Sequence, residues 1–273
     1  MRLRRSDRIS SERMTSRPQV ICIPGSVAPA AQRYRPLTDT VGDAAELHMK
    51  DLEVYREATP PADYSIEEEL AAIDRFAESN GLERFHLVGY SGGGFISLAY
   101  SGTHPDRILS LGLFEPARIP GLLTAEEQAF FTEIERKLDG LHGDQFMATF
   151  VREQVRPGAV LAPPPPGPPS PEMQKRPAGI AALIKAFDAY RFERDLLLAA
   201  PFPVFYGYGD LSHEEQALKA GILARLFADF RVHRYAGVHH FVPPEQIYTP
   251  QHVSALLGLW HGAETSAAQA SRQ

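Results

Sequence analysis

The stretch Val88–Gly94 reads VGYSGGG and joins two segments of different pattern. Residues 85–88 before it are mainly apolar and predict a buried strand, whereas residues 95–100 after it lack turn residues and predict a helix. When a strand turns into a helix through one residue, that residue takes a strained backbone conformation, and glycines on either side allow the close approach. We therefore predict that Ser91 lies on this turn with its hydroxyl above the sheet edge. A glycine-rich turn with an inert serine is the alternative.

Strand and helix patterns alternate along most of the chain. Ser65 followed by Glu68 predicts a capped helix start between two of the strands. Short connections of this kind predict an α/β fold with a mostly parallel central sheet and helices on both faces. The predicted strands occupy residues 19–23, 47–55, 85–88, 108–114, 202–206 and 231–235, and the main predicted helices occupy residues 37–41, 65–79, 95–100, 213–230 and 251–260.

The alternation is interrupted between about residues 116 and 199, where no strand pattern occurs. Amphipathic patterns predict helices at residues 124–138 and 144–155, and a further helix at 180–190. Residues 163–169 read PPPPGPP, a run that fits neither a helix nor an inner strand and predicts an extended loop. We therefore expect a helical insertion with a proline-rich loop, which could act as a gate over a site.

Composition narrows the classes of function. The chain has 273 residues, 44% of them hydrophobic, and a formal net charge of −6, with no basic stripe that would suggest nucleic acid. Cys22 is the single cysteine, so neither an intrachain disulfide nor a cysteine-based zinc site is expected. No segment approaches the ~20 apolar residues of a membrane helix. The arginine-rich residues 1–17 lack the apolar core of a secretory signal, so we expect a disordered leader, a disordered tail at residues 263–273 and a cytoplasmic protein.

Three chemically suitable side chains follow predicted strands in the order Ser91, Asp210, His240. Ligand sites of parallel sheets form at the carboxyl ends of the strands, so these side chains are expected to converge. A serine hydroxyl is a poor nucleophile at neutral pH. It needs a base within hydrogen-bond reach, and the base needs an acid that orients it.

The chain resembles the α/β-hydrolase fold superfamily over roughly residues 18–261. The resemblance is carried by residues 89–93 (GYSGG), 207–210 (GYGD) and 237–242 (GVHHFV), with 104–108 (HPDRI) resembling the turn after the elbow helix. It implies a core formed by residues 18–115 and 200–262, with residues 116–199 forming a helical cap.

The resemblance also implies roles for individual residues. His240, just before an aromatic residue, matches the base of the family better than His239. Asp210 is the favoured acid, and Glu115, directly after the strand that follows the elbow, is the alternative acid. The amides of Gly92 and Ser26 are expected to form the oxyanion hole, with Val27 as a substitute for Ser26; the chain has Pro24-Gly25 where many members have His-Gly.

The expected function is that of a serine hydrolase that cleaves a carboxylic ester of a small molecule through an acyl-enzyme. A lactonase, thioesterase, C–C bond hydrolase or proline-type aminopeptidase of the same fold remains open, as does a non-hydrolytic binding member. Serine at the elbow, where a carboxylate would be needed, argues against epoxide hydrolases and dehalogenases. No metal or organic cofactor is expected, and the oligomeric state is open.

Overall fold

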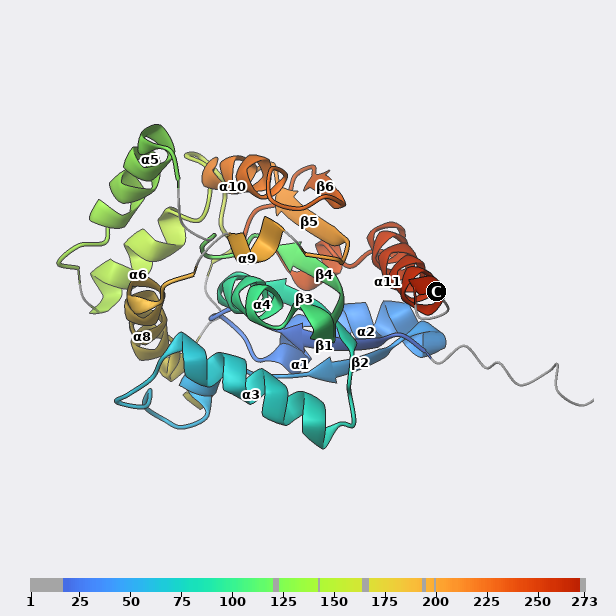
Figure 1. The fold of residues 1–273 in the computed structure, drawn as a ribbon. Coiled ribbons are helices and arrows are strands. Elements are labelled where there is room, and N and C mark those ends of the chain that lie inside the picture. The colour runs from blue at the N-terminus through green and yellow to red at the C-terminus, as the bar shows by residue number, and fades with distance from the viewer. Residues whose placement is uncertain are drawn as a thin grey trace, which may run out of the picture.

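The computed structural model describes residues 17–119, 123–141, 143–163, 167–192, 195–198 and 200–270. Its centre is a six-stranded sheet in the order β2-β1-β3-β4-β5-β6, and every neighbouring pair is parallel (Figure 1). The predicted α/β fold is therefore confirmed. The strands are β1 (Gln19–Ile23), β2 (Glu46–Met49), β3 (Phe85–Tyr90), β4 (Ile108–Phe114), β5 (Val204–Gly209) and β6 (Phe230–Tyr235).

Helices cover both faces of the sheet because its inner strands are apolar on both sides. Successive residues of β1 divide between the two cores: Ile21 and Ile23 belong to one, Val20 and Cys22 to the other. The first core lies under α3 (Ile66–Ser79), α4 (Gly92–Thr103) and α10 (Glu215–Leu223). The second lies under α1 (Ala30–Arg33), α2 (Arg35–Val41) and α11 (Pro250–Ala270).

The expected helical insertion lies between β4 and β5. It contains α5 (Ala125–Arg136), α6 (Gly143–Arg152), α7 (Pro171–Gln174), α8 (Arg176–Ala189) and α9 (Asp195–Leu198). α5 and α6 contribute no buried residue, and Figure 1 shows them at the outer side of the molecule. α8 instead buries Leu183 and Phe187 in the first core. Part of the proline-rich loop, residues 164–166, lies outside the described residues.

Short 3₁₀ turns fill the connections at Gly42–Ala44 (η1), Glu53–Tyr55 (η2), Pro105–Arg107 (η3) and Pro244–Gln246 (η4). The strand predicted for residues 47–55 therefore ends early, at Met49. The last Cα pairing with β1 is Cys22 with Met49, and the amide of Lys50 makes one further hydrogen bond, to the carbonyl of Cys22 at 3.0 Å, before the chain turns into η2. The helix predicted for residues 213–230 also ends early, because Phe230 pairs with Val204 at the start of β6.

The C-terminal segment differs from its prediction as well. Residues 263–270, expected to be disordered, continue α11, and the chain from Gly262 to Ala270 contains no proline or further glycine that would stop it. Ala263 is buried, and the Glu264 carboxylate lies 3.8 Å from Nε2 of the buried His86. The predicted leader lies outside the described residues except for Arg17, which lies near Asp43 and Glu46.

The turn from β3 into α4 packs directly against the loop after β1. The amide of Gly93 donates to the carbonyl of Pro24 at 3.1 Å. A Cβ added at Gly93 would lie 2.3 Å from that same oxygen. Only a residue without a side chain fits this backbone contact.

Gly93→Ala should therefore lower the free energy of unfolding by about 1–3 kcal/mol, because backbone rather than a flexible side chain must shift. Gly258 of α11 is the matched control, since a Cβ there meets nothing within 4 Å. Gly258→Ala should raise the free energy of unfolding by about 0.5–1 kcal/mol through its better helix propensity. Urea unfolding followed by circular dichroism measures the free energy of unfolding of both variants. The same change in that free energy in the two variants would contradict the packing argument.

Candidate active site

Ser91 lies at the sharp turn between β3 and α4, as its glycine neighbours predict. Its backbone has φ 53° and ψ −118°, an uncommon conformation for a residue other than glycine. Hydrogen bonds hold it there: its amide donates to the carbonyl of Phe114 at 3.1 Å, and its carbonyl accepts from Ala117 at 2.8 Å. The turn places the partly exposed side chain at the carboxyl edge of the sheet.

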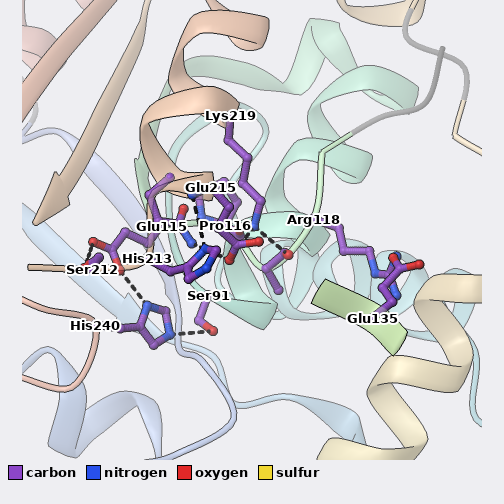
Figure 2. A network of polar contacts seen from close by, with 12 residues as sticks. Ser91, Glu115, Pro116, Arg118, Glu135, Ser212, His213, Glu215, Lys219 and His240 are labelled. Carbon is purple, nitrogen blue, oxygen red and sulfur yellow. Dashed lines mark hydrogen bonds and ion pairs between the residues drawn. The ribbon is translucent and has the colours of Figure 1, made fainter. Parts of the chain in front are cut away.

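His240 comes from the loop after β6 and reaches Ser91 across the sheet edge. Its Nε2 lies 3.2 Å from Ser91 Oγ, and its Nδ1 lies 2.6 Å from Oε2 of Glu115 (Figure 2). The Tyr90 hydroxyl donates to the carbonyl of His240 at 2.6 Å, and the two rings stack with centroids 5.0 Å apart. The imidazole is thus held from both sides, with a side-chain exposure of 3%.

Glu115 is the acid in contact with His240. It follows β4 directly, is fully buried, and has φ 46°. Its Oε1 accepts from the amide of Gly209 at 2.7 Å and from the hydroxyl of Ser212 at 2.5 Å, while Oε2 faces His240. A buried carboxylate is costly unless its lone pairs are used, and these donors use them.

The backbone gives an independent sign of function. Within the described residues, the non-glycine residues with positive φ are Ser91 and Glu115. Strained conformations of this kind concentrate at functional sites because the surrounding structure must hold them. Here both belong to one hydrogen-bonded chain of three side chains.

The structure places Glu115, and not the favoured Asp210, in contact with His240. Asp210 does not orient His240: its Oδ1 accepts from the amide of Gly237 at 2.8 Å and its Oδ2 lies 3.8 Å from Arg234. The physical reason is strand order and register. β4 is the direct neighbour of β3, and Tyr90 pairs with Phe114, so Glu115 is level with Ser91. Asp210 lies one strand further away and beyond the end of β5, where it braces the turn after β6.

A buried cation accompanies the buried acid. Lys219 of α10 donates to the carbonyl of Pro116 at 3.1 Å and to that of Ala117 at 2.9 Å, and it pairs with Glu215 at 3.2 Å (Figure 2). Burial lowers the pKa of its ammonium group, and the nearby carboxylate of Glu215 opposes that shift. Lys219 thus fixes the start of the insertion directly after Glu115.

The two residues expected in the oxyanion hole lie next to each other. A Cβ added at Gly92 would lie 3.3 Å from Ser26 Oγ, and Ser26 is buried. One added at Gly25 would lie 2.8 Å from Cβ of Ser91, so the loop after β1 touches the elbow. Val27, the substitute, packs partly buried against the second core. The oxyanion hole itself stays a prediction.

His239, the other candidate base, points elsewhere. Its Nδ1 accepts from the amide of Phe241 at 3.1 Å. Burial lowers the pKa of its imidazole, and the backbone of Val160 in the insertion opposes that shift. The choice of His240 over His239 agrees with the contact that His240 makes with Ser91.

The insertion forms one wall beside the elbow. Atoms of Phe187 and Leu183 of α8 would lie 3.8 Å and 3.9 Å from a Cβ added at Gly92. At the start of α8, Arg176 is 3% exposed, stacks over the Tyr55 ring at 4.0 Å and donates to the carbonyl of Ser26 at 3.5 Å. The insertion therefore brings two apolar side chains to the elbow and a guanidinium group to the loop of Ser26.

Other classes of site find no support in the described residues. Within those ranges, no three His, Cys, Asp or Glu side chains gather in a way that could hold a metal ion. No helix of the described chain has the length and apolar character needed to cross a membrane.

One functional contact was not anticipated from the sequence. Ser212, two residues after Asp210, donates to Glu115 from a loop 97 positions further along the chain. No local pattern marks it. The sequence gives a weak indication that Glu115 is functional, because an acidic residue directly after a buried strand and before a proline has no simple packing role.

Comparison with known proteins agrees with this architecture. The sequence pattern of the alpha/beta hydrolase fold matches residues 48–152. A monoacylglycerol lipase of Xenopus laevis (abhd6-A) is 41% identical over 75 residues, which cover 27% of this chain and 21% of that protein. A second form from the same organism (abhd6-B) is 40% identical over 74 residues. The match thus spans about a fifth of the length of these curated relatives.

Solved structures resemble nearly the whole chain. An esterase from Thermogutta terrifontis has a TM-score of 0.65 at 18% identity, covering 91% of this chain and 91% of that one. The carboxylesterase CesB from Bacillus subtilis has a TM-score of 0.64 at 16% identity, covering 91% and 85%. A membrane phospholipase A described as a bacterial virulence factor has a TM-score of 0.65 at 18% identity, covering 91% and 80%. The chain therefore has the alpha/beta hydrolase fold, and its residues 48–152 match the sequence pattern of that fold.

Proposed function

We propose that the protein is a serine hydrolase that cleaves a carboxylic ester of a small apolar molecule, with Ser91, His240 and Glu115 as its triad. The observation that carries the proposal is the continuous hydrogen-bonded chain from Ser91 Oγ through both ring nitrogens of His240 to Glu115 Oε2. A nucleophile, a base and an orienting acid in this arrangement activate a hydroxyl for attack on a carbonyl carbon.

The triad implies a two-step acyl transfer. Ser91 Oγ bonds to the carbonyl carbon while its proton passes to Nε2 of His240. Nδ1–H of His240 donates throughout to Glu115, which stabilises the imidazolium. The tetrahedral oxyanion would be held by the amides of Gly92 and Ser26. As the bond to the alcohol breaks, Nε2 returns the proton to the alcohol oxygen, and a water molecule then repeats the sequence on the acyl-enzyme.

The walls of the site favour an apolar acyl or alcohol group. Leu183 and Phe187 of the insertion lie beside Gly92 at the elbow. We assign to residues 116–199 the role of a cap over Ser91 on this ground. The same chemistry would open a lactone or a thioester, so a comparison of esters, lactones and thioesters of increasing chain length identifies the preferred class.

Ser91→Ala should lose turnover of short p-nitrophenyl esters by at least about 1,000-fold, because no other group replaces the attacking oxygen. It should also lose covalent labelling by a fluorophosphonate probe, which reacts with activated serines. The matched control is Ser101→Ala in the same helix, whose buried hydroxyl donates to the carbonyl of Leu98. Ester turnover by Ser91→Ala at the level of the control would exclude the proposed nucleophile.

Exchange of the two candidate acids tests the triad directly. Glu115→Gln should reduce kcat by about 10³–10⁴-fold, because an amide cannot stabilise the imidazolium. Asp210→Asn should stay within about tenfold of wild type, because its side-chain oxygen can still accept from Gly237. Steady-state kinetics of both variants measures this, and the reverse order of effects would restore Asp210 as the acid.

A further inference from the structure

The helical insertion touches the loop after β5, which carries the Ser212 hydroxyl bonded to Glu115. After α6 the chain runs antiparallel to the loop that follows β5, with Val155 bridged to Ser212. The amide of Arg156 donates to the carbonyl of Leu211 at 2.9 Å, and the amide of His213 donates to the carbonyl of Gln154 at 3.1 Å. We call residues 154–160 the strap.

The strap is anchored by burial as well as by hydrogen bonds. Val155 is 1% exposed and Ser212 is 2% exposed, so both sides of the bridge are removed from solvent. The two backbone hydrogen bonds flank this buried pair, although Arg156 and Leu211 are themselves exposed. The strap therefore holds residues 211–213 in one position relative to the sheet.

The strap holds Ser212, whose hydroxyl group hydrogen-bonds the carboxylate of Glu115. The Ser212 hydroxyl donates to Glu115 Oε1 at 2.5 Å, on the oxygen that does not face His240 (Figure 2). The amide of Gly209 donates to the same oxygen. These two donors set the rotation of the carboxylate, and the rotation decides whether Oε2 points at Nδ1 of the imidazole.

The other end of the strap reaches the base. The backbone of Val160 opposes the burial that lowers the pKa of the His239 imidazole, and His239 is the residue before His240. The amide of Leu211 in turn donates to the carbonyl of Val238 at 2.9 Å. The strap, the loop after β5 and the loop after β6 thus form one continuous series of contacts that reaches both Glu115 and His240.

We propose that the strap and Ser212 position the triad, so that the acid and base are aligned when the helical insertion is docked on the core. Ser212 acts through Glu115 and is a positioning residue. The inference rests on the proposed hydrolase function and adds that part of the insertion sets catalytic rate. Displacements of about 1 Å at catalytic groups can cost about 100-fold in rate, so a modest shift of the strap is enough.

Ser212→Ala should lower kcat and the second-order rate of fluorophosphonate labelling by about tenfold, with KM within about twofold, because the lost donor acts on the triad and not on substrate binding. Ser212→Thr keeps the hydroxyl and should restore most of the rate. The control is Ser110→Ala, which removes a buried hydroxyl bonded to Nδ1 of His86 at 2.8 Å. It should change thermal stability and leave kcat unchanged.

The strap is tested through one backbone donor. Arg156→Pro removes the amide that donates to Leu211, whereas Arg156→Ala removes the side chain and keeps that amide. The proline variant should lose kcat and labelling rate by about tenfold relative to the alanine variant, and thermal unfolding should show both folded at the assay temperature.

The outcomes separate the two proposals. Wild-type protein that neither labels nor turns over any ester, lactone or thioester would overturn the proposed function. Active wild type with unchanged kcat in Ser212→Ala and Arg156→Pro would overturn the positioning role alone. Loss of kcat that follows loss of thermal stability equally in Ser212→Ala and Ser110→Ala would also overturn it, since a purely structural role predicts that result.

Discussion

The contact between the elbow and the loop after β1 is the constraint on which the rest of the site depends. Gly93 donates to Pro24, and the space between the two backbones leaves no room for a Cβ. This contact sets where α4 begins, and with it the position of Ser91 and of the Gly92 amide at a helix N-terminus, where the aligned peptide dipoles favour negative charge. The glycines are a steric requirement of the site.

Burial of Glu115 is the second constraint. A carboxylate removed from water is stable only when its oxygens accept hydrogen bonds and opposite charge lies close. The chain satisfies this from three separate segments: β5 supplies the Gly209 amide, the loop after it supplies Ser212, and the loop after β6 supplies His240. Lys219 adds a cation against the backbone that follows the acid. β4 therefore fixes the backbone position of Glu115, and β5 together with the loops after β5 and β6 supplies the partners of its carboxylate.

The helical insertion has two different parts. α5 and α6 bury no residues, whereas α8 packs into the first core and the strap pairs with the loop after β5. Contacts near Ser91 come from the second group, through Leu183, Phe187 and Arg176. The part of the insertion that lies beside the elbow is thus joined, through the strap, to the loop whose Ser212 contacts the acid of the proposed triad.

The sequence by itself determined the features that depend on local pattern. Strand order along the chain, the elbow around Ser91, the insertion after β4 and the preference for His240 over His239 all follow from short-range apolar spacing, glycines and motif context. The acid did not follow from such a pattern, because Asp210 and Glu115 both leave strand ends and motif order favours Asp210. Only the tertiary structure distinguishes their positions: adjacency of β3 and β4 puts Glu115 level with Ser91, whereas Asp210 braces the turn at Gly237, which is why Glu115 is the acid of the proposed triad. The early end of β2, the helical continuation to Ala270 and the role of Ser212 were decided in the same way, by partners distant in the chain that no local pattern can specify.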